Sequence, residues 1–293
     1  MNGASRRTWT PWEPLEDAWK RTAVPSSPGL YRIRRVGRDD LDYIGQTGMG
    51  TMTLRKRLAM LKGVFGSLMP YRDPHTAAPA LWSLRQLGGE FEVSVAAVQG
   101  STPWRKALEA VEIGLYRQEH LKSPTVNFGR MPKGFSMSSG NNAKLVAAGK
   151  RHRGGPTAIE DESHLPGLPP PGPLGGDPQA AEWCGHQWST WKPVEAVANL
   201  SRAAGLYRLR DGAMKGLLYI GQGLVRARLQ AHVAKTLRPD DEQGRVFAKR
   251  NRLECSFVLN PALLAHQRLE LENDLIAAHV LATGEVPPAQ FIG

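Results

Sequence analysis

Cysteine and long apolar runs are both scarce in this 293-residue sequence. Its two cysteines, Cys184 and Cys255, are too few for the disulfide framework of a small secreted domain, and their spacing matches no zinc motif. No run approaches the roughly 18 apolar residues that a membrane helix needs. The segment Met1–Trp12 lacks the apolar core of a secretory signal. We therefore expect a cytoplasmic protein with no structural metal and no membrane partner.

Acidic residues are also few relative to basic ones. The sequence has 38 lysines and arginines against 27 aspartates and glutamates, which gives a formal net charge of +11. A surplus of positive charge attracts polyanions, so nucleic acid is the first partner to consider. A similar surplus occurs in proteins that bind no nucleic acid, so the motifs must decide. The composition, with 41% hydrophobic and 22% charged residues, is that of a folded globular protein.

An internal repeat organises the chain. Four blocks recur in the same order in the two halves, and the second and third blocks keep the same spacing. The first copy has Trp9-x-x-Trp12, Gly29-Leu30-Tyr31-Arg32, Tyr43-Ile44-Gly45-Gln46 and Leu54-Arg55-Lys56-Arg57. The second copy has Trp188-x-x-Trp191, Gly205-Leu206-Tyr207-Arg208, Tyr219-Ile220-Gly221-Gln222 and Val225-Arg226-Ala227-Arg228. The chain therefore contains a duplicated module.

A segment rich in proline and glycine separates the copies and has no helical or strand periodicity. The sequence predicts a first module with a basic extension over residues 1–153, a linker over 154–181 and a second module over 182–293. The linker length allows the modules either to pair or to sit apart. We expect a monomer with two pseudo-symmetric modules, or a homodimer.

Hydrophobic periodicity predicts the same small α+β module twice. In the first copy it predicts strands at 30–36, 41–45 and 91–98, and helices at 53–65, 78–87 and from Pro103 to about Leu121. In the second copy it predicts strands at 206–209, 217–221 and 253–259, and helices at 224–237 and from Pro261. Strands that are joined directly pair antiparallel. Each module is therefore predicted to be a three-stranded, mostly antiparallel sheet flanked by helices.

Each copy aligns the residue types that phosphodiester cleavage needs. A carboxylate can hold magnesium or manganese, an arginine can clamp a phosphate, and a phenol can relay a proton. Each copy has one tyrosine in the first strand, one at the end of the second strand, an arginine on the next helix and a glutamate on the last helix. The sets are Tyr31, Tyr43, Arg57 and Glu112, and Tyr207, Tyr219, Arg228 and Glu272.

The two Gly-Leu-Tyr and Tyr-Ile-Gly blocks resemble the signature of the GIY-YIG nuclease family. This resemblance covers about residues 28–128 and 204–291. It implies a small sheet with flanking helices and metal-dependent hydrolysis of DNA, with one Mg²⁺ or Mn²⁺ ion per active module. The two tyrosines and the arginine of the family then fall on the residues given above in both copies.

The resemblance also implies a histidine four residues after the helix arginine. The second copy has His232 there, on the same helical face as Arg228. The first copy has Leu61, which fits a buried helical stripe. His75 could substitute from another direction, and the alternative is that it belongs to a turn that begins a helix.

The metal ligand of the family corresponds to Glu112 and Glu272, with a less secure register than the tyrosines. Four neighbouring carboxylates compete for this role: Glu109, Glu119, Glu270 and Asp274. The family asparagine corresponds to Asn127 in the first copy. The second copy has Gln290 at the matching place, which departs from the pattern.

A basic segment without acidic residues follows the first copy, from Arg130 to Gly155. Basic side chains mixed with small polar ones are typical of contacts to the duplex backbone and grooves. The DNA-binding candidates are Arg130, Lys133, Asn141, Asn142, Lys144, Lys150, Arg151 and Arg153. The alternative is an ordinary solvated tail. The repeated tryptophan pairs are expected to pack against their own modules.

The sequence thus predicts a metal-dependent endonuclease that acts on double-stranded DNA, with each module cutting one strand. The absence of helicase-like or other recognition segments favours restriction or another defence against foreign DNA. A non-catalytic or half-catalytic DNA-binding protein is the main alternative, supported by Leu61 and Gln290. A repair nickase or an RNA-directed nuclease is a weaker one.

Overall fold

The computed structural model describes residues 7–159, 161–213, 216–250 and 252–292. The contacts divide them into two units. The N-terminal unit contains residues 7–105 and Pro124–Pro166, and the C-terminal unit contains Lys106–Ser123 and residues 167–292. The segment Lys106–Ser123 belongs to the first copy by sequence but groups by contacts with the second. The module boundaries expected from the sequence stay a prediction.

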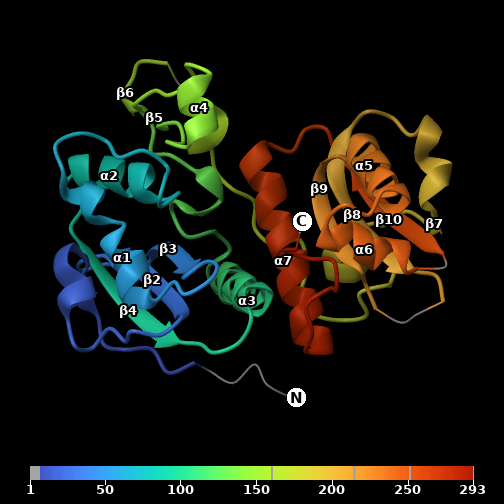
Figure 1. The fold of residues 1–293 in the computed structure, drawn as a ribbon, viewed down its shortest axis with the longest axis horizontal. Coiled ribbons are helices and arrows are strands. Elements are labelled where there is room, and N and C mark those ends of the chain that lie inside the picture. Colours follow the sequence, from blue (N-terminus) through green and yellow to red (C-terminus); the bar gives the residue numbers. More distant parts are fainter. Residues whose placement is uncertain (1–6, 160, 214–215, 251, 293) are drawn as a thin grey trace. The chain divides into compact units, whose positions relative to one another are not determined.

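Each unit contains one four-stranded antiparallel sheet (Figure 1). The N-terminal sheet has the order β1-β4-β2-β3, and the C-terminal sheet has the matching order β7-β10-β8-β9. The strands of the first are β1 (Glu13–Pro14), β2 (Gly29–Arg35), β3 (Leu41–Gln46) and β4 (Phe91–Ala97). Those of the second are β7 (Lys192–Pro193), β8 (Ala204–Asp211), β9 (Tyr219–Leu224) and β10 (Leu253–Leu259).

The structure confirms an α+β fold with antiparallel sheets but corrects the strand number. The sequence predicts three strands per sheet, and each sheet has a fourth, β1 or β7. These strands are two residues long and end in proline, which cannot donate a ladder hydrogen bond and is confined to sheet edges. Strands of this kind carry no alternating pattern that the sequence could reveal.

The helices that follow the β2–β3 and β8–β9 hairpins differ between the copies. The first copy has α1 (Leu54–Ala59), a 3-10 helix at Lys62–Phe65 and α2 (Ala78–Gln86). The single helix expected at 53–65 is therefore interrupted. The second copy has a longer helix, α5 (Val225–Leu237), and then α6 (Glu242–Ala248). The sequence did not predict α6, which begins where the Asp241 carboxylate accepts a hydrogen bond from the Gly244 amide at 2.7 Å.

The last helix of each copy is long and largely buried. These helices are α3 (Thr102–His120) and α7 (Ala265–Thr283). The prediction that α7 begins at Pro261 was wrong. Asn260 instead closes a turn by accepting a hydrogen bond from the Ala262 amide at 3.1 Å, and this delays the helix.

The basic segment after the first copy is folded in the N-terminal unit. It contains β5 (Phe135–Ser136), α4 (Ala143–Ala147) and β6 (Gly155–Pro156), and β5 pairs with β6. Figure 1 shows these three elements next to one another, above α2 in the view. Asn142 begins α4 by accepting a hydrogen bond from the Leu145 amide at 3.1 Å.

Tryptophans and arginines interleave in each copy. The tryptophans precede the first long strand and the arginines alternate along it, with guanidinium carbons between 4.1 and 4.8 Å from the ring centroids. The series are Trp9, Arg32, Trp12 and Arg34 in the first copy, and Trp188, Arg208, Trp191 and Arg210 in the second. The tryptophan pairs therefore pack against strands of their own copy.

A buried ionic network joins α3 to α7 within the C-terminal unit. Arg117 donates two hydrogen bonds to the Asp274 carboxylate, at 2.7 and 2.9 Å, and one to the Leu168 carbonyl at 2.9 Å. Glu270 accepts hydrogen bonds from the Ser123 hydroxyl at 2.6 Å and the Leu168 amide at 2.8 Å. The three charged side chains are at most 2% exposed. The network fixes the two helices and the chain near Leu168 to one another.

No helix in the described part of the chain is long and apolar enough to cross a membrane.

Replacing Arg117 by leucine should lower the thermal midpoint of the C-terminal unit markedly. The change leaves two carboxylates buried without their cation, which typically costs about 3–5 kcal/mol. Thermal unfolding followed by circular dichroism would measure it. Arg38→Leu, at an exposed arginine, is the control and should leave the midpoint nearly unchanged. Equal midpoints for both variants would contradict this account.

Candidate functional site

The two tyrosines of each copy meet over a glycine. Tyr31 on β2 pairs with Gly45 on β3, and Tyr207 on β8 pairs with Gly221 on β9. A Cβ atom at Gly45 would lie 2.5 Å from the Tyr31 hydroxyl oxygen, and one at Gly221 would lie 2.5 Å from that of Tyr207. Only glycine leaves room for the phenol across the strand pair. The sequence offered a signal for this role, because both glycines recur at the same place.

A histidine completes each pair of tyrosines. His75 Nε2 lies 2.7 Å from the Tyr31 hydroxyl, and His232 Nε2 lies 2.9 Å from the Tyr207 hydroxyl. The ring centroids of the three side chains are 5.7 to 5.9 Å apart in the first copy and 4.9 to 6.0 Å apart in the second. We call these the tyrosine–histidine clusters. They are Tyr31, Tyr43 and His75, and Tyr207, Tyr219 and His232.

The two histidines reach their clusters from different elements. His232 lies on α5, one helical turn after Arg228. The corresponding residue of the first copy, Leu61, is fully buried in the hydrophobic core. His75 instead comes from the irregular chain before α2 and is also fully buried. Both copies therefore form the same histidine–tyrosine contact, although the two histidines lie on different elements.

An arginine lies beside each cluster. Arg228 forms side-chain hydrogen bonds to Tyr207 and Tyr219, and these phenols raise its pKa. Arg57 donates a hydrogen bond to the Pro74 carbonyl at 2.9 Å. Its charge also acts on His75 and contributes to lowering the pKa of that imidazole. Each cluster therefore has a positive charge that is close enough to neutralise an anion.

Burial sets the protonation of the second cluster. It raises the pKa of Tyr207 and Tyr219 above the usual phenol value, so both stay protonated at neutral pH. Burial, together with the charge of Arg228, lowers the pKa of His232 to about 4. Burial likewise lowers the pKa of His75 well below its usual value. Both imidazoles are therefore neutral at neutral pH.

The backbone fixes the tautomer of His75. The Ala77 amide donates a hydrogen bond to His75 Nδ1 at 3.3 Å, so a neutral ring carries its proton on Nε2. His75 therefore donates to the Tyr31 hydroxyl oxygen and leaves the phenol proton free to point elsewhere. The Nδ1 atom of His232 is buried and has no hydrogen-bond partner among the described residues. No bond to Nδ1 sets the tautomer of His232, so its Nε2 is able to accept the proton of Tyr207 when the ring proton is on Nδ1.

One of the two predicted metal ligands lies at a cluster. The Glu272 carboxylate accepts a hydrogen bond from the Gln222 amide, and its charge acts on Tyr207 and Tyr219. Burial, partly offset by Arg228, raises the pKa of Glu272 to about 7. Glu112 lies on the part of α3 that groups with the C-terminal unit, not with Tyr31. Its assignment to the first cluster stays a prediction.

Two of the competing carboxylates have other partners. Glu270 and Asp274 both belong to the buried network around Arg117. Within the part of the chain that the structure describes, no group of three or more histidine, cysteine, aspartate or glutamate side chains could hold a metal ion.

Asn127 and Gln290 support strand edges. The Asn127 side chain accepts from the Ile44 amide at 3.0 Å and donates to the Ile44 carbonyl at 2.9 Å. Gln290 accepts from the Ile220 amide at the same distance, 3.0 Å. Strands β3 and β9 are edge strands, so these amides satisfy backbone groups that the sheet leaves unpaired. The geometry supports a structural role for both residues.

Most of the DNA-binding candidates are exposed on the N-terminal unit. Arg130 is half-buried and donates to the Leu165 carbonyl at 3.3 Å. The side chain of Asn142 is used as the cap of α4. The remaining exposed residues are Lys133, Asn141, Lys144, Lys150, Arg151 and Arg153.

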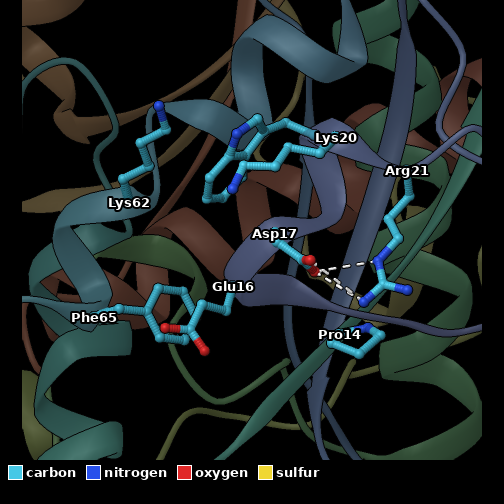
Figure 2. Close-up of a pocket in the computed structure, with 8 residues that line it drawn as sticks. Pro14, Glu16, Asp17, Lys20, Arg21, Lys62 and Phe65 are labelled. Atoms are coloured by element: carbon cyan, nitrogen blue, oxygen red, sulfur yellow. Dashed lines mark hydrogen bonds and ion pairs between the residues drawn. The ribbon is translucent and has the colours of Figure 1, made fainter.

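A surface depression of about 520 Å³ lies apart from the clusters, against the 3-10 helix Leu15–Lys20. Figure 2 shows Arg21 reaching Asp17, and these two side chains hydrogen-bond at 3.1 and 3.2 Å. Lys20 and Lys62 lie 5.9 and 5.1 Å from the Trp19 ring centroid. The depression contains no residue of the tyrosine–histidine clusters, so we do not assign it to the same site.

Comparison with known proteins gave no matching family model, no matching curated protein and no matching solved structure.

Replacing Gly221 by alanine should disrupt the second cluster. The new methyl group would meet the Tyr207 ring, and overpacking of this kind costs about 1–3 kcal/mol. Thermal unfolding should show a lower midpoint, and near-ultraviolet circular dichroism should show a changed tyrosine environment. Gly175→Ala is the matched control, because nothing lies within 4 Å of a Cβ atom there. An unchanged tyrosine signal in Gly221→Ala would argue against the described packing.

The neutral histidines should make stability fall in mild acid. Their folded pKa values lie below the unfolded value of about 6.5, so the unfolded chain binds more protons below that pH. Stability present at neutral pH should therefore be lost as the pH falls from about 6.5 toward 4, by up to about 1.4 kcal/mol per pH unit and histidine. Glu272 and Asp274, whose pKa values burial raises to about 7 and about 6, contribute in the opposite direction, so the histidine part is measured as the difference in thermal midpoint between the wild type and a variant without the two histidines.

The variant His75→Gln/His232→Gln should show a shallower fall over the same range. The remaining slope combines His186 and His279, whose pKa values burial also lowers to about 4, with Glu272 and Asp274, whose raised pKa values act in the opposite direction. The exposed His120 provides the control substitution, His120→Gln. A double variant as acid-sensitive as the wild type would exclude this explanation.

Proposed function

We propose that the protein is a metal-dependent DNA endonuclease of the GIY-YIG type, in which the two copies act as an intramolecular pair. The observation that carries the proposal is the duplicated cluster. Both copies place a neutral histidine on the first tyrosine and an arginine beside it, although the histidines come from different elements. If the position of His232 served only to fill the core, a leucine would be sufficient there, as Leu61 is at the corresponding position of the first copy.

The second cluster suggests how a proton could leave an attacking water. Tyr207 is protonated at neutral pH, so it can accept a proton only if it passes its own onward. His232 is neutral and its Nε2 faces the Tyr207 hydroxyl at 2.9 Å. We assign Tyr207 and His232 to a relay that removes the water proton as the phosphate is attacked. Arg228, beside both phenols, stabilises the charge that develops on the phosphate.

The first cluster would also remove the water proton through its tyrosine, but there the histidine donates a hydrogen bond to the tyrosine. His75 donates to the Tyr31 oxygen, so Tyr31 would release its own proton to solvent, and the hydrogen bond would stabilise the phenolate that then accepts the proton of the attacking water. Arg57 is the counterpart of Arg228. The two copies thus place the same groups, a tyrosine, a histidine and an arginine, together.

Glu272 would hold the divalent cation of the second copy, together with water and phosphate oxygens. The cation would supply positive charge at the scissile phosphate. Glu112 is assigned to the first copy on the sequence resemblance. The exposed basic residues near α4 would contact the phosphate backbone of double-stranded DNA. A role in restriction or another defence against foreign DNA is the setting that we favour.

A half-catalytic protein is the second candidate. The observation that favours it is the position of Glu272, whose charge acts on the tyrosines of its own copy, whereas Glu112 lies on the part of α3 that groups by contacts with the C-terminal unit. In that case only the second copy would cut, and the product would be nicked DNA.

Cleavage of supercoiled plasmid in Mg²⁺ or Mn²⁺ tests the proposal. The wild type should linearise the plasmid, whereas Glu112→Ala and Glu272→Ala should each only nick it. The second cut should slow by about 100-fold or more, because a lost cation ligand removes several kcal/mol of transition-state stabilisation. The double variant should leave the plasmid supercoiled.

Glu119→Ala is the matched control, since Glu119 is an exposed carboxylate on the same helix as Glu112. A wild type that only nicks, with no effect of Glu112→Ala, would select the half-catalytic protein. Linearisation by the double variant would refute both metal assignments. A wild type that binds DNA and cuts neither strand, in plasmids with or without base modification, would refute the nuclease.

A further inference from the structure

His75 depends on a loop that another part of the chain must hold. His232 is fixed by helix α5, but residues 66–77 contain no helix or strand. The carbonyl that accepts from Arg57 belongs to Pro74 in this same loop. The position of the loop therefore decides two contacts of the first cluster, those of His75 and Arg57.

The segment 134–156, with β5, α4 and β6, contacts this loop at several residues; we call this segment the brace. The Asn141 amide donates to the Asp73 carboxylate at 2.7 Å, and the Arg72 amide donates to the Ser139 carbonyl at 3.1 Å. Arg153 donates to the Met69 carbonyl at 2.6 Å. These bonds reach the chain from two to six residues before His75.

Two further contacts join the brace to the loop. The guanidinium carbons of Arg151 and Arg153 lie 4.3 and 4.4 Å from the Tyr71 ring centroid. A Cβ atom at Gly140 would lie 2.9 Å from the Asp73 carboxylate, so the brace approaches Asp73 as closely as a glycine allows. The loop is therefore held on both its backbone and its side chains.

The brace is basic. It contains no acidic residue, and Lys144, Lys150, Arg151 and Arg153 are exposed. In the second copy, His232 is held by helix α5 itself. The basic surface and the support of His75 therefore occur in one and the same segment.

We propose that the brace is a DNA-contacting support that positions His75 and Arg57, so that contact of its cations with DNA phosphates steadies the first cluster. Asp73 is a positioning residue in this scheme, acting through Pro74 and His75. The DNA-dependent part rests on the proposed function. The support of His75 is a property of the chain itself and can be tested without cleavage.

The first arm of the test uses the full-length protein labelled with ¹⁵N-histidine. In the wild type, His75 should show the neutral tautomer with its proton on Nε2. Asp73→Ala should move the His75 signals toward a mixture of tautomers and leave those of His232 unchanged. Asp73→Asn keeps an oxygen that accepts from Asn141, and it should restore the wild-type signals. Asp39→Ala, at an exposed carboxylate of the same unit, is the control.

The second arm is plasmid cleavage by the same variants. Asp73→Ala should still nick the plasmid through the second copy, with linearisation slowed about tenfold or more, and Asp73→Asn should recover it. His75 signals that stay unchanged in Asp73→Ala would overturn the support. Shifted His75 signals with linearisation at the wild-type rate would overturn its link to catalysis. A wild type that never cuts, with shifted signals in Asp73→Ala, would refute the nuclease and leave the support established.

Discussion

The contact between a phenol ring and a glycine on the neighbouring strand is the constraint on which each site depends. Tyr31 lies over Gly45, and Tyr207 lies over Gly221, at distances that exclude any side chain. This contact turns the phenol inward, where the histidine meets it. The second tyrosine can then approach within 6 Å, and burial of the rings follows. Burial in turn keeps Tyr207 protonated and both imidazoles neutral.

The two copies illustrate how one arrangement of side chains can be kept while the backbone around it changes. α5 is long enough to carry Arg228 and His232 on successive turns, whereas α1 ends at Ala59 and turns Leu61 into the core. The first copy supplies its histidine from a loop. The segment 134–156 provides the hydrogen bonds that hold this loop. His232 of the second copy lies on a helix instead.

The sequence predicted the antiparallel α+β character and most strand positions, because these depend on local periodicity and on a repeat. It did not predict β1, β7 or α6, whose residues follow no periodic pattern. The Arg117 network could not be predicted either, since its carboxylates are 153 or more residues away and were weighed as metal ligands. His75 was only one option, because its contact with Tyr31 depends on the path of an irregular loop. The roles of Asn127 and Gln290 became clear from hydrogen bonds to backbone atoms, which sequence alone does not reveal.

The grouping of Lys106–Ser123 with the second copy has a consequence for the history of the chain. A gene divided within the proline-rich stretch would separate the guanidinium of Arg117 from the two acids it neutralises, and the downstream product would fold around an uncompensated charge. The halves have thereby lost the autonomy that a fresh duplication possesses. The two copies therefore diverge within a single polypeptide, where one copy can lose a function only if the other copy keeps it.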